Sequence, residues 1–417
     1  MLNEQALSPK IDITVKNKLI IFITMVLIVI TSGSVLFGKL YYSLFIMILF
    51  ATAVVFYFPK RIEPKHFLTL MVILAFILFN LLLYRDNIGG YGGLILKILA
   101  IFMIINRLDI HQAGKSYQWI IVALALLSLP FYALGVVSPE FVRSTFPTVD
   151  VWNGVYRITP FYVYGNWNMS RNQGIFWEPG AFQVFLNLGI FLMLFTNRKL
   201  PKWQLILVTG TLLTTMSTSG YMICGLIYFA YLIRSGKRKQ MTQLIIPLLL
   251  LIPLIYFESQ SGVIADKFQD GNQSFDRRSL DTTSNLELMI EKPLVGWGFQ
   301  NNSVLMERYG IGDSSNSLLT FGYQFGLPLL LIMLIYYYSR LQRAIGSVFQ
   351  SILIFIALII VFSTENMIFQ PLFVMLMFFD VKASEQKLKS GEQLHGNEVN
   401  RLRSPLRGRA IAPEKGI

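Results

Sequence analysis

Residues 170–187, SRNQGIFWEPGAFQVFLN, join a polar loop to an apolar segment, and the rest of the chain is organised around them. Pro179 suits the first turn of a helix, because its missing N–H has no intrahelical partner there. The stretch therefore predicts a membrane helix with Glu178 at its mouth, where the positive end of the helix dipole favours an ionised carboxylate. Arg171 precedes Glu178 in the polar loop. We expect a chemical site that faces water at the edge of a bilayer.

The composition is that of an integral membrane protein. The 417 residues are 54% hydrophobic and 14% charged, with a mean hydropathy of +0.55, which is far too apolar for a soluble domain. The apolar residues come in blocks of about 20, the length that crosses roughly 30 Å of hydrocarbon as a helix. We therefore expect an all-α, polytopic membrane fold with about twelve transmembrane helices. The expected spans are 19–36, 40–58, 67–83, 92–106, 118–137, 176–195, 203–216, 219–233, 243–257, 316–338, 348–363 and 366–379.

The net charge of +13 arises mostly in short loops between apolar blocks and in the C-terminal tail. Basic residues in such places set membrane topology and contact anionic headgroups, so we expect a lipid bilayer and no nucleic acid as the partner of this charge. Cys224 is the only cysteine, which excludes an intrachain disulfide. The first apolar block lacks a small-residue cleavage site, so we expect it to remain as the first span.

The distribution of lysine and arginine orients the spans. Alternate short connections are rich in these residues, whereas the opposite short connections contain only Lys39 and Arg85. Basic loops stay on the cytoplasmic side, so we expect both termini in the cytoplasm. The basic set comprises Lys60, Arg61, Lys65, Arg107, Lys115, Arg198, Lys199, Lys202, Arg234, Lys237, Arg238, Lys239, Arg340 and Arg343.

This topology divides the chain into three parts. Residues 1–18 form a cytoplasmic N-terminal segment, 19–379 the transmembrane domain, and 380–417 a basic cytoplasmic tail that we expect to be disordered. Two long loops, at about 138–175 and about 258–315, then lie outside the cytoplasm. Long loops in compact proteins are usually functional, so we expect the site there.

Histidine and cysteine chemistry is excluded from the outer face. His66 and His111 belong to cytoplasmic connections, His395 belongs to the tail, and Cys224 lies inside an apolar block. The outer face therefore has no imidazole base, no thiol nucleophile and no His/Cys metal site. Carboxylates and arginines remain, and the planar arginine fork suits the oxygens of a pyrophosphate. The arginines of the long loops are Arg143, Arg157, Arg171, Arg277, Arg278 and Arg308.

Several of these residues have a structural explanation beside a functional one. Glu178 is either a favourable first-turn residue or a general base that removes a proton from a sugar hydroxyl. Trp177 either belongs to an interfacial aromatic belt or stacks on a sugar ring. Arg277 and Arg278, in SFDRRSLD (274–281), either form ion pairs on an amphipathic surface helix or hold phosphate.

Two further signals mark the end of the second loop. Pro293, Gly296 and Gly298 predict a tight turn. Ser315 or Asn316 then supplies the N-cap of the tenth span. Together they return the chain from the second loop to the membrane.

These features together resemble the Wzy-type polysaccharide polymerases of the O-antigen polymerase/ligase group. The resemblance covers about 165–335, and the first five spans match only in hydropathy. Ligases of this group usually carry a histidine where this chain has Ser315, which favours a polymerase. The matching elements are Arg171-x-x-Gly174-x-x-x-Glu178-Pro179-Gly180, STSGY (217–221), Arg277 with Arg278, PLVGWG (293–298), and Ser315-Asn316 with Gly326.

The resemblance implies a membrane glycosyltransferase that polymerises undecaprenyl-diphosphate-linked oligosaccharide repeat units into a surface polysaccharide such as O-antigen, capsule or exopolysaccharide. It implies a bacterial cytoplasmic membrane location, no nucleotide sugar, no cofactor and no metal ion. A chain-length regulator and a flippase are candidate partners. The candidate catalytic residues are Glu178, Arg171, Arg277 and Arg278, and the candidate substrate-binding residues are Arg157, Asn316 and Trp177.

Two other functions stay open. Ligase-type transfer of the glycan to another acceptor differs from polymerisation only in the acceptor. A flippase or transporter for the lipid-linked glycan predicts charges inside several spans, and Lys97 is the main one present.

Overall fold

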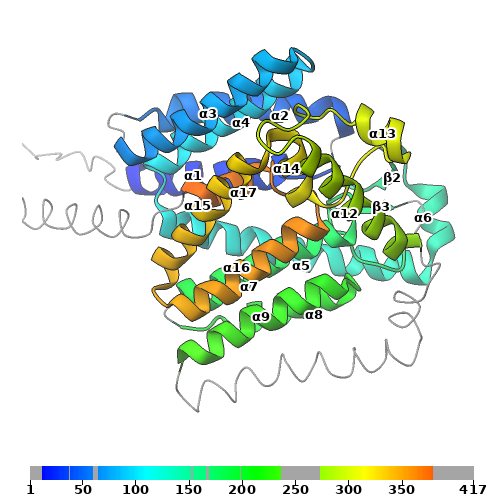
Figure 1. The fold of residues 1–417 in the computed structure, drawn as a ribbon. Coiled ribbons are helices and arrows are strands. Elements are labelled where there is room, and N and C mark those ends of the chain that lie inside the picture. Colours follow the sequence, from blue (N-terminus) through cyan, green and yellow to red (C-terminus); the bar gives the residue numbers. More distant parts are fainter. Residues whose placement is uncertain are drawn as a thin grey trace, which may run out of the picture. The chain divides into compact units, whose positions relative to one another are not determined.

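The computed structural model describes residues 12–36, 38–59, 64–151, 154–165, 169–197, 199–235 and 273–378. These residues belong to one compact unit, and its described part is mostly helical, with fifteen helices (Figure 1). The expected span at 243–257, the first part of the second loop and the tail at 380–417 lie outside the described residues.

The helices are numbered along the chain. Those before the Arg171 loop are α1 (Asp12–Thr31), α2 (Gly38–Tyr57), α3 (Pro64–Tyr84), α4 (Ile88–Arg107), α5 (Ile110–Val137) and α6 (Pro139–Thr145). Those after it are α7 (Pro179–Thr196), α8 (Lys202–Thr214), α9 (Thr218–Ser235), α12 (Gln273–Glu291), α13 (Ser303–Tyr309), α14 (Ser317–Phe325), α15 (Leu327–Ile345), α16 (Val348–Thr364) and α17 (Pro371–Phe378).

The apolar helices indicate a membrane protein, but they do not confirm twelve spans. Among the described residues, α3, α4, α5 and α7 are long and apolar enough to cross a bilayer, while α1, α2 and α16 contribute shorter apolar stretches. The expected tenth span is broken at Gly326, where φ is +88° and Pro328 follows in the first turn of α15. The expected last span shrinks to the eight residues of α17, which extend about 12 Å as a helix and so cross less than half of the hydrocarbon.

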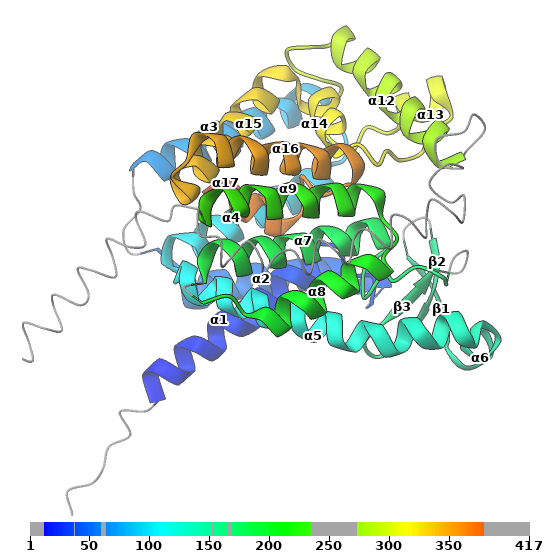
Figure 2. The ribbon, with the colours of Figure 1, turned by 90° about the horizontal axis from the view of Figure 1, so that it is seen from below.

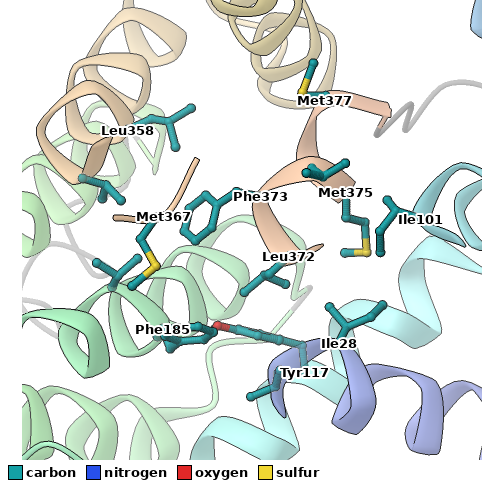
Figure 3. Packing of buried hydrophobic residues seen from close by; sticks show 14 of the residues in the cluster. Ile28, Ile101, Tyr117, Phe185, Leu358, Met367, Leu372, Phe373, Met375 and Met377 are labelled. Atoms are coloured by element: carbon teal, nitrogen blue, oxygen red, sulfur yellow. Dashed lines mark hydrogen bonds between the residues drawn. The ribbon is translucent and has the colours of Figure 1, made fainter. Parts of the chain in front are cut away.

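The short helix α17 is packed inside the helical bundle. It contacts α1, α4 and α15. Figure 3 shows Leu372 of α17 above the Tyr117 and Phe185 rings, and Met375 beside Ile101. The Tyr117 hydroxyl donates a 3.0 Å hydrogen bond to the Phe185 carbonyl, so the pair links α5 to α7. Such close side-chain packing is the main force that holds helices together in a membrane.

The first long loop contains a small β-sheet, which the expectation of an all-α fold did not include. Its strands are β1 (Thr148–Val151), β2 (Gly154–Ile158) and β3 (Val163–Gly165), antiparallel in the order β1-β2-β3. Valine and tyrosine favour strands, and the sheet buries them against the end of α1. The small core consists of Val35, Val151, Tyr156 and Val163, with Trp177 packed against it.

The second loop is attached to the break between α14 and α15. The backbone N–H of Trp297 donates to the Tyr323 carbonyl at 2.7 Å, and Leu327 donates to Pro293 at 2.7 Å. Gly296 has φ +69°, and a Cβ there would overlap the backbone of Gln324. The glycine turn predicted from the sequence is therefore confirmed, and it closes on the helix break.

The loops gather at one end of the helices. Figure 2 shows α12, α13, α6 and the sheet at the same end of the bundle, and Figure 1 agrees. An antiparallel bridge between Ser34 and Phe176 joins the end of α1 to the segment that leads into α7. This bridge fixes the segment just before Glu178 against the end of α1.

Candidate functional site

Four segments meet at the loop end of the bundle and bring charged side chains together. They are the loop that leads into α7, the helix α12, the loop before α14, and the turn that follows α16. The charged residues that interact electrostatically there are Arg171, Glu178, Arg277, Arg278, Asp281, Asp313 and Glu365. We call this set the carboxyl–arginine cluster.

Glu178 occupies the N-cap position of α7, with Pro179 in the first turn, as the sequence predicts. Its side chain makes no capping hydrogen bond to its own helix, so the carboxylate is available to other groups. The Trp177 indole N–H donates to Glu178 Oε1 at 2.8 Å. A Cβ at Gly33 would overlap the Trp177 ring, which shows that the end of α1 holds this indole in place.

Glu365 follows α16 and shares a hydrogen bond with Glu178. Glu365 is only 1% exposed, and its Oε2 atom is buried without a hydrogen-bond partner among the described residues. Burial raises the pKa of Glu365 well above its usual range, and the charge and hydrogen bond of Glu178 add to the rise, while Arg278 and Arg171 oppose it. Burial and the neighbouring carboxylate therefore both favour the neutral form of Glu365.

Gly180 makes the contact between the two carboxyls possible. It lies in the first turn of α7, and a Cβ at this position would overlap the Glu365 carboxyl group. The glycine of the Glu-Pro-Gly sequence therefore leaves the space that Glu365 occupies. This role depends on a residue far away in the sequence, so the pattern alone did not reveal it.

Arg171 is fixed by the hairpin between α8 and α9. Its Nε donates to the Thr215 carbonyl at 3.0 Å, and the neighbouring Asn172, fully buried, bonds to Thr214 Oγ1 at 2.9 Å and Ser128 Oγ at 3.1 Å. Burial lowers the pKa of Arg171, and the negative charges of Glu178 and Glu365 oppose this effect. An arginine remains charged under such a shift. Arg171 is therefore a cation that acts on both carboxyl groups of the pair.

The helix α12 presents Arg277 and Arg278 as exposed side chains. Asp281, one turn further on, is 1% exposed and its Oδ2 accepts from both the backbone N–H and the hydroxyl of Ser315, each at 3.0 Å. One face of α12 is thus buried through Asp281, and its exposed face carries the two arginines. The segment 274–281 thus lies on an amphipathic surface helix, as one of the two alternatives for these arginines predicts.

The loop before α14 adds Asp313 and Asn316. Desolvation raises the pKa of Asp313, Asp281 and Glu178 add to the rise, and Arg277 opposes it. The Asn316 side chain accepts from the Leu319 N–H at 3.1 Å, so the predicted cap of this helix is confirmed. Its amide also donates to Thr282 Oγ1 at 3.4 Å. Both polar ends of Asn316 therefore serve the structure.

Arg157 lies apart from the cluster. It belongs to β2, and its guanidinium donates to the Phe146 carbonyl at 2.9 Å inside the same loop. The adjacent residue, Tyr156, is the one that interacts with Glu178: burial raises the pKa of Tyr156 to about 12, and the Glu178 charge contributes. The structure thus brings together Glu178, Trp177, Arg171 and Arg278, with Arg277 beside Asp313.

Glu365 is the main residue for which the sequence analysis proposed no role. The only signal was a carboxylate between two apolar runs, in STENMIFQP (363–371), which is costly at a membrane unless it is solvated or paired. Among the described residues, no three His, Cys, Asp or Glu side chains are arranged to hold a metal ion. Exposed guanidiniums beside the carboxyl pair instead suit an anionic group.

Comparisons with protein-family models and with curated proteins find no match to this chain.

Proposed function

We propose that the protein is a membrane glycosyltransferase that polymerises undecaprenyl-diphosphate-linked oligosaccharide repeat units into a surface polysaccharide. The observation that carries this proposal is the carboxyl–arginine cluster. It places a hydrogen-bonded carboxyl pair, Glu178 with Glu365, beside the exposed arginines of α12. A base and an anion-binding surface are the two groups that this transfer requires.

In the proposed reaction, the growing chain on one undecaprenyl diphosphate is the donor. An acceptor hydroxyl of a new lipid-linked unit forms a bond from its oxygen to the anomeric carbon of the donor and gives its proton to Glu178. The bond between that carbon and the diphosphate oxygen breaks, and its electron pair leaves with undecaprenyl diphosphate. Arg277 and Arg278 hold the diphosphate and stabilise the charge that develops on it.

Arg171 has a different part in this proposal. Its Nε is already bonded to Thr215, and it lies in the field of Glu178 and Glu365. It balances the negative charge of the carboxyl pair at the mouth of α7. The diphosphate then binds mainly at the arginines of α12, away from the like charge of Glu178.

A small apolar cleft in the helical bundle is compatible with a lipid-linked substrate. The cleft lies between α3, α4, α14, α15 and α17, and every residue that lines it is apolar. Phe321 and Phe325 of α14 and Phe369, which follows Glu365 in the α16–α17 turn, are among these residues. A polyprenyl chain is apolar along its whole length, so this cleft suits part of one.

We further propose that the helices span a bacterial cytoplasmic membrane, with both termini in the cytoplasm and the cluster outside. The positions of basic residues support this orientation. The α4 helix begins beside the second loop, where Asn87 donates to Gln300 at 2.8 Å, and ends at Arg107. The α9 helix begins near Thr215, the partner of Arg171, and carries Arg234 in its last turn. Both basic helix ends thus lie away from the cluster.

Ligase-type transfer and flipping of the lipid-linked glycan remain the alternative functions. The Lys97 ammonium, in the middle of α4, donates to the Phe369 carbonyl at 3.4 Å and so has a structural partner. A deletion strain distinguishes the three functions by gel analysis of its surface glycans. Loss of long chains with single repeat units still exposed outside supports the polymerase, absence of any exposed unit supports a flippase, and accumulation of finished but untransferred chains supports a ligase.

Complementation of the deletion strain tests the base. Wild-type protein is expected to restore long chains, and Glu178→Gln, which cannot accept the proton, is expected not to restore them at equal expression. Glu291→Gln is the matched control, because Glu291 is an exposed partner of Arg308 outside the cluster. Normal chain lengths with Glu178→Gln would remove this residue from the mechanism.

A further inference from the structure

Two hydrogen-bond donors meet at the Glu178 carboxylate. One is the Trp177 indole N–H, which bonds to Oε1 at 2.8 Å. The other is Glu365, which shares a hydrogen bond with Glu178 from the opposite wall of the site. The indole does not titrate, whereas a carboxyl group donates a hydrogen bond only when it is protonated. The hydrogen bond from Glu365 therefore depends on the protonation of its carboxyl group.

The surroundings of Glu365 favour a neutral carboxyl group. Its residue is 1% exposed, and Oε2 has no hydrogen-bond partner among the described residues. An ionised carboxylate needs several donors, and burying one without them is costly. The described charged groups that act on it are Glu178 from α7, Arg278 from α12 and Arg171 from the loop before α7. Arg171 also acts on Arg278 and on Glu178, so it does not belong to Glu365 alone.

The backbone around Glu365 is held in place by the start of α14. The Ser317 hydroxyl donates to the carbonyls of Phe362 at 3.0 Å and Glu365 at 2.7 Å. The backbone N–H of Met367 donates to the Glu365 carbonyl at 2.9 Å. The α14 start is in turn bonded to α12 through Ser315 and Asp281. Glu365 is therefore a rigid group on the same framework that carries the arginines.

We infer that Glu365 is a positioning residue: its buried carboxyl group, packed against Gly180 in the first turn of α7, donates its hydrogen bond to Glu178 and orients that carboxylate to accept the proton of the acceptor hydroxyl. The inference rests on the proposed function for its catalytic meaning. The hydrogen bond itself is a property of the protein without substrate. Two other titratable groups interact with Glu178: Tyr156 from β2 and Asp313 from the loop before α14.

The substitution Glu365→Gln tests this role, because the amide is neutral and keeps an N–H donor. Glu365→Leu removes the donor with a side chain of similar length. The full-length protein is purified in nanodiscs, and the pH at which half of Glu178 reacts with a water-soluble carbodiimide is measured by mass spectrometry. Carbodiimides react with protonated carboxyls, so this midpoint reports the ionisation of Glu178 without any assay of activity.

We expect the midpoint of Glu365→Gln to match the wild type, and that of Glu365→Leu to move upward, because one donor to the ionised form is lost. In complemented cells, Glu365→Gln is expected to make long chains and Glu365→Leu only short ones. Glu291→Gln is the control for both measurements, since Glu291 is exposed and its ion-pair partner, Arg308, does not belong to the cluster.

Two results would overturn the inference. One is a folded Glu365→Gln protein that makes no long chains although its Glu178 midpoint is normal, because Glu365 would then have to release its proton. The other is an unchanged midpoint in Glu365→Leu, or, where that variant does not fold, a shifted midpoint in Glu365→Gln. Failure of the proposed function looks different: the midpoints behave as expected, while the deletion strain keeps its long chains.

Discussion

Asp281 of α12 accepts two hydrogen bonds from Ser315, one from its backbone N–H and one from its hydroxyl, both at 3.0 Å. The Asp281 side chain is almost fully buried, whereas Arg277 and Arg278 on the same helix are exposed. This contact fixes α12 on the start of α14. The arginines that we assign to the diphosphate therefore depend on a buried aspartate for their position.

Asp281→Ala is expected to destabilise the attachment of α12. It leaves the two Ser315 donors without their acceptor, which costs about 1–3 kcal/mol. The midpoint of thermal unfolding in detergent should fall, and limited proteolysis should cut α12 sooner. Asp276→Ala is the matched control, because Asp276 is exposed on the same helix. Equal stability of the two variants would show that the Asp281–Ser315 contact does not hold the helix.

Arg278→Ala is expected to reduce polymer formation about tenfold to a hundredfold, the effect of losing one charged hydrogen bond of roughly 1.5–3 kcal/mol. Arg278→Lys should retain more activity, because the positive charge remains even though the fork is lost. The measurement is the rate of chain extension on lipid-linked units in membranes. Arg308→Ala serves as the control, since Arg308 pairs with Glu291 at 2.6 Å outside the cluster. Equal effects at both positions would argue against a specific phosphate contact at Arg278.

The stability of the protein is expected to fall as the pH rises above the usual value of 4.5 for a glutamate. The folded state raises the pKa of Glu365, chiefly through burial, so the folded protein holds a proton that the unfolded chain releases. Stability is then lost by about 1.4 kcal/mol per pH unit over the window between the two values, and the loss is absent below it. Unfolding midpoints between pH 5 and pH 8 measure this slope.

Glu365→Gln is the comparison for that slope, because glutamine does not titrate. The variant should gain stability relative to the wild type at pH 8 and show little gain at pH 5. Glu291→Gln, at an exposed position, should follow the wild-type slope. If Glu365→Gln also kept the wild-type slope, the titrating group would be another residue.

Gly180→Ala is expected to abolish long chains, because the added methyl group overlaps the Glu365 carboxyl group and separates the pair. Gly210→Ala is the matched control: Gly210 lies inside α8, and a Cβ there meets nothing within 4 Å. That control should be neutral or slightly stabilising, since alanine favours a helix over glycine. Chain-length profiles of the two complemented strains give the comparison, and full activity of Gly180→Ala would contradict the close carboxyl contact.

The sequence by itself determined the features that depend on neighbouring residues. Pro179 sets the start of α7 with Glu178 at its N-cap, Asn316 caps α14, and Gly296 with Gly298 forms the turn of the second loop. Each is decided by local backbone geometry, which a few adjacent residues control. The apolar blocks likewise predicted helices, because their length and composition suit a membrane.

Only the tertiary structure decided which distant groups meet. The pairing of Glu178 with Glu365 requires the start of α7 to meet the end of α16, with Gly180 leaving the space between them. The break at Gly326 follows from the second-loop turn that packs against it, since Leu327 bonds to Pro293. Hydrogen bonds, burial and charge act between atoms that are close in space, and the order of residues along the chain does not state which segments fold together.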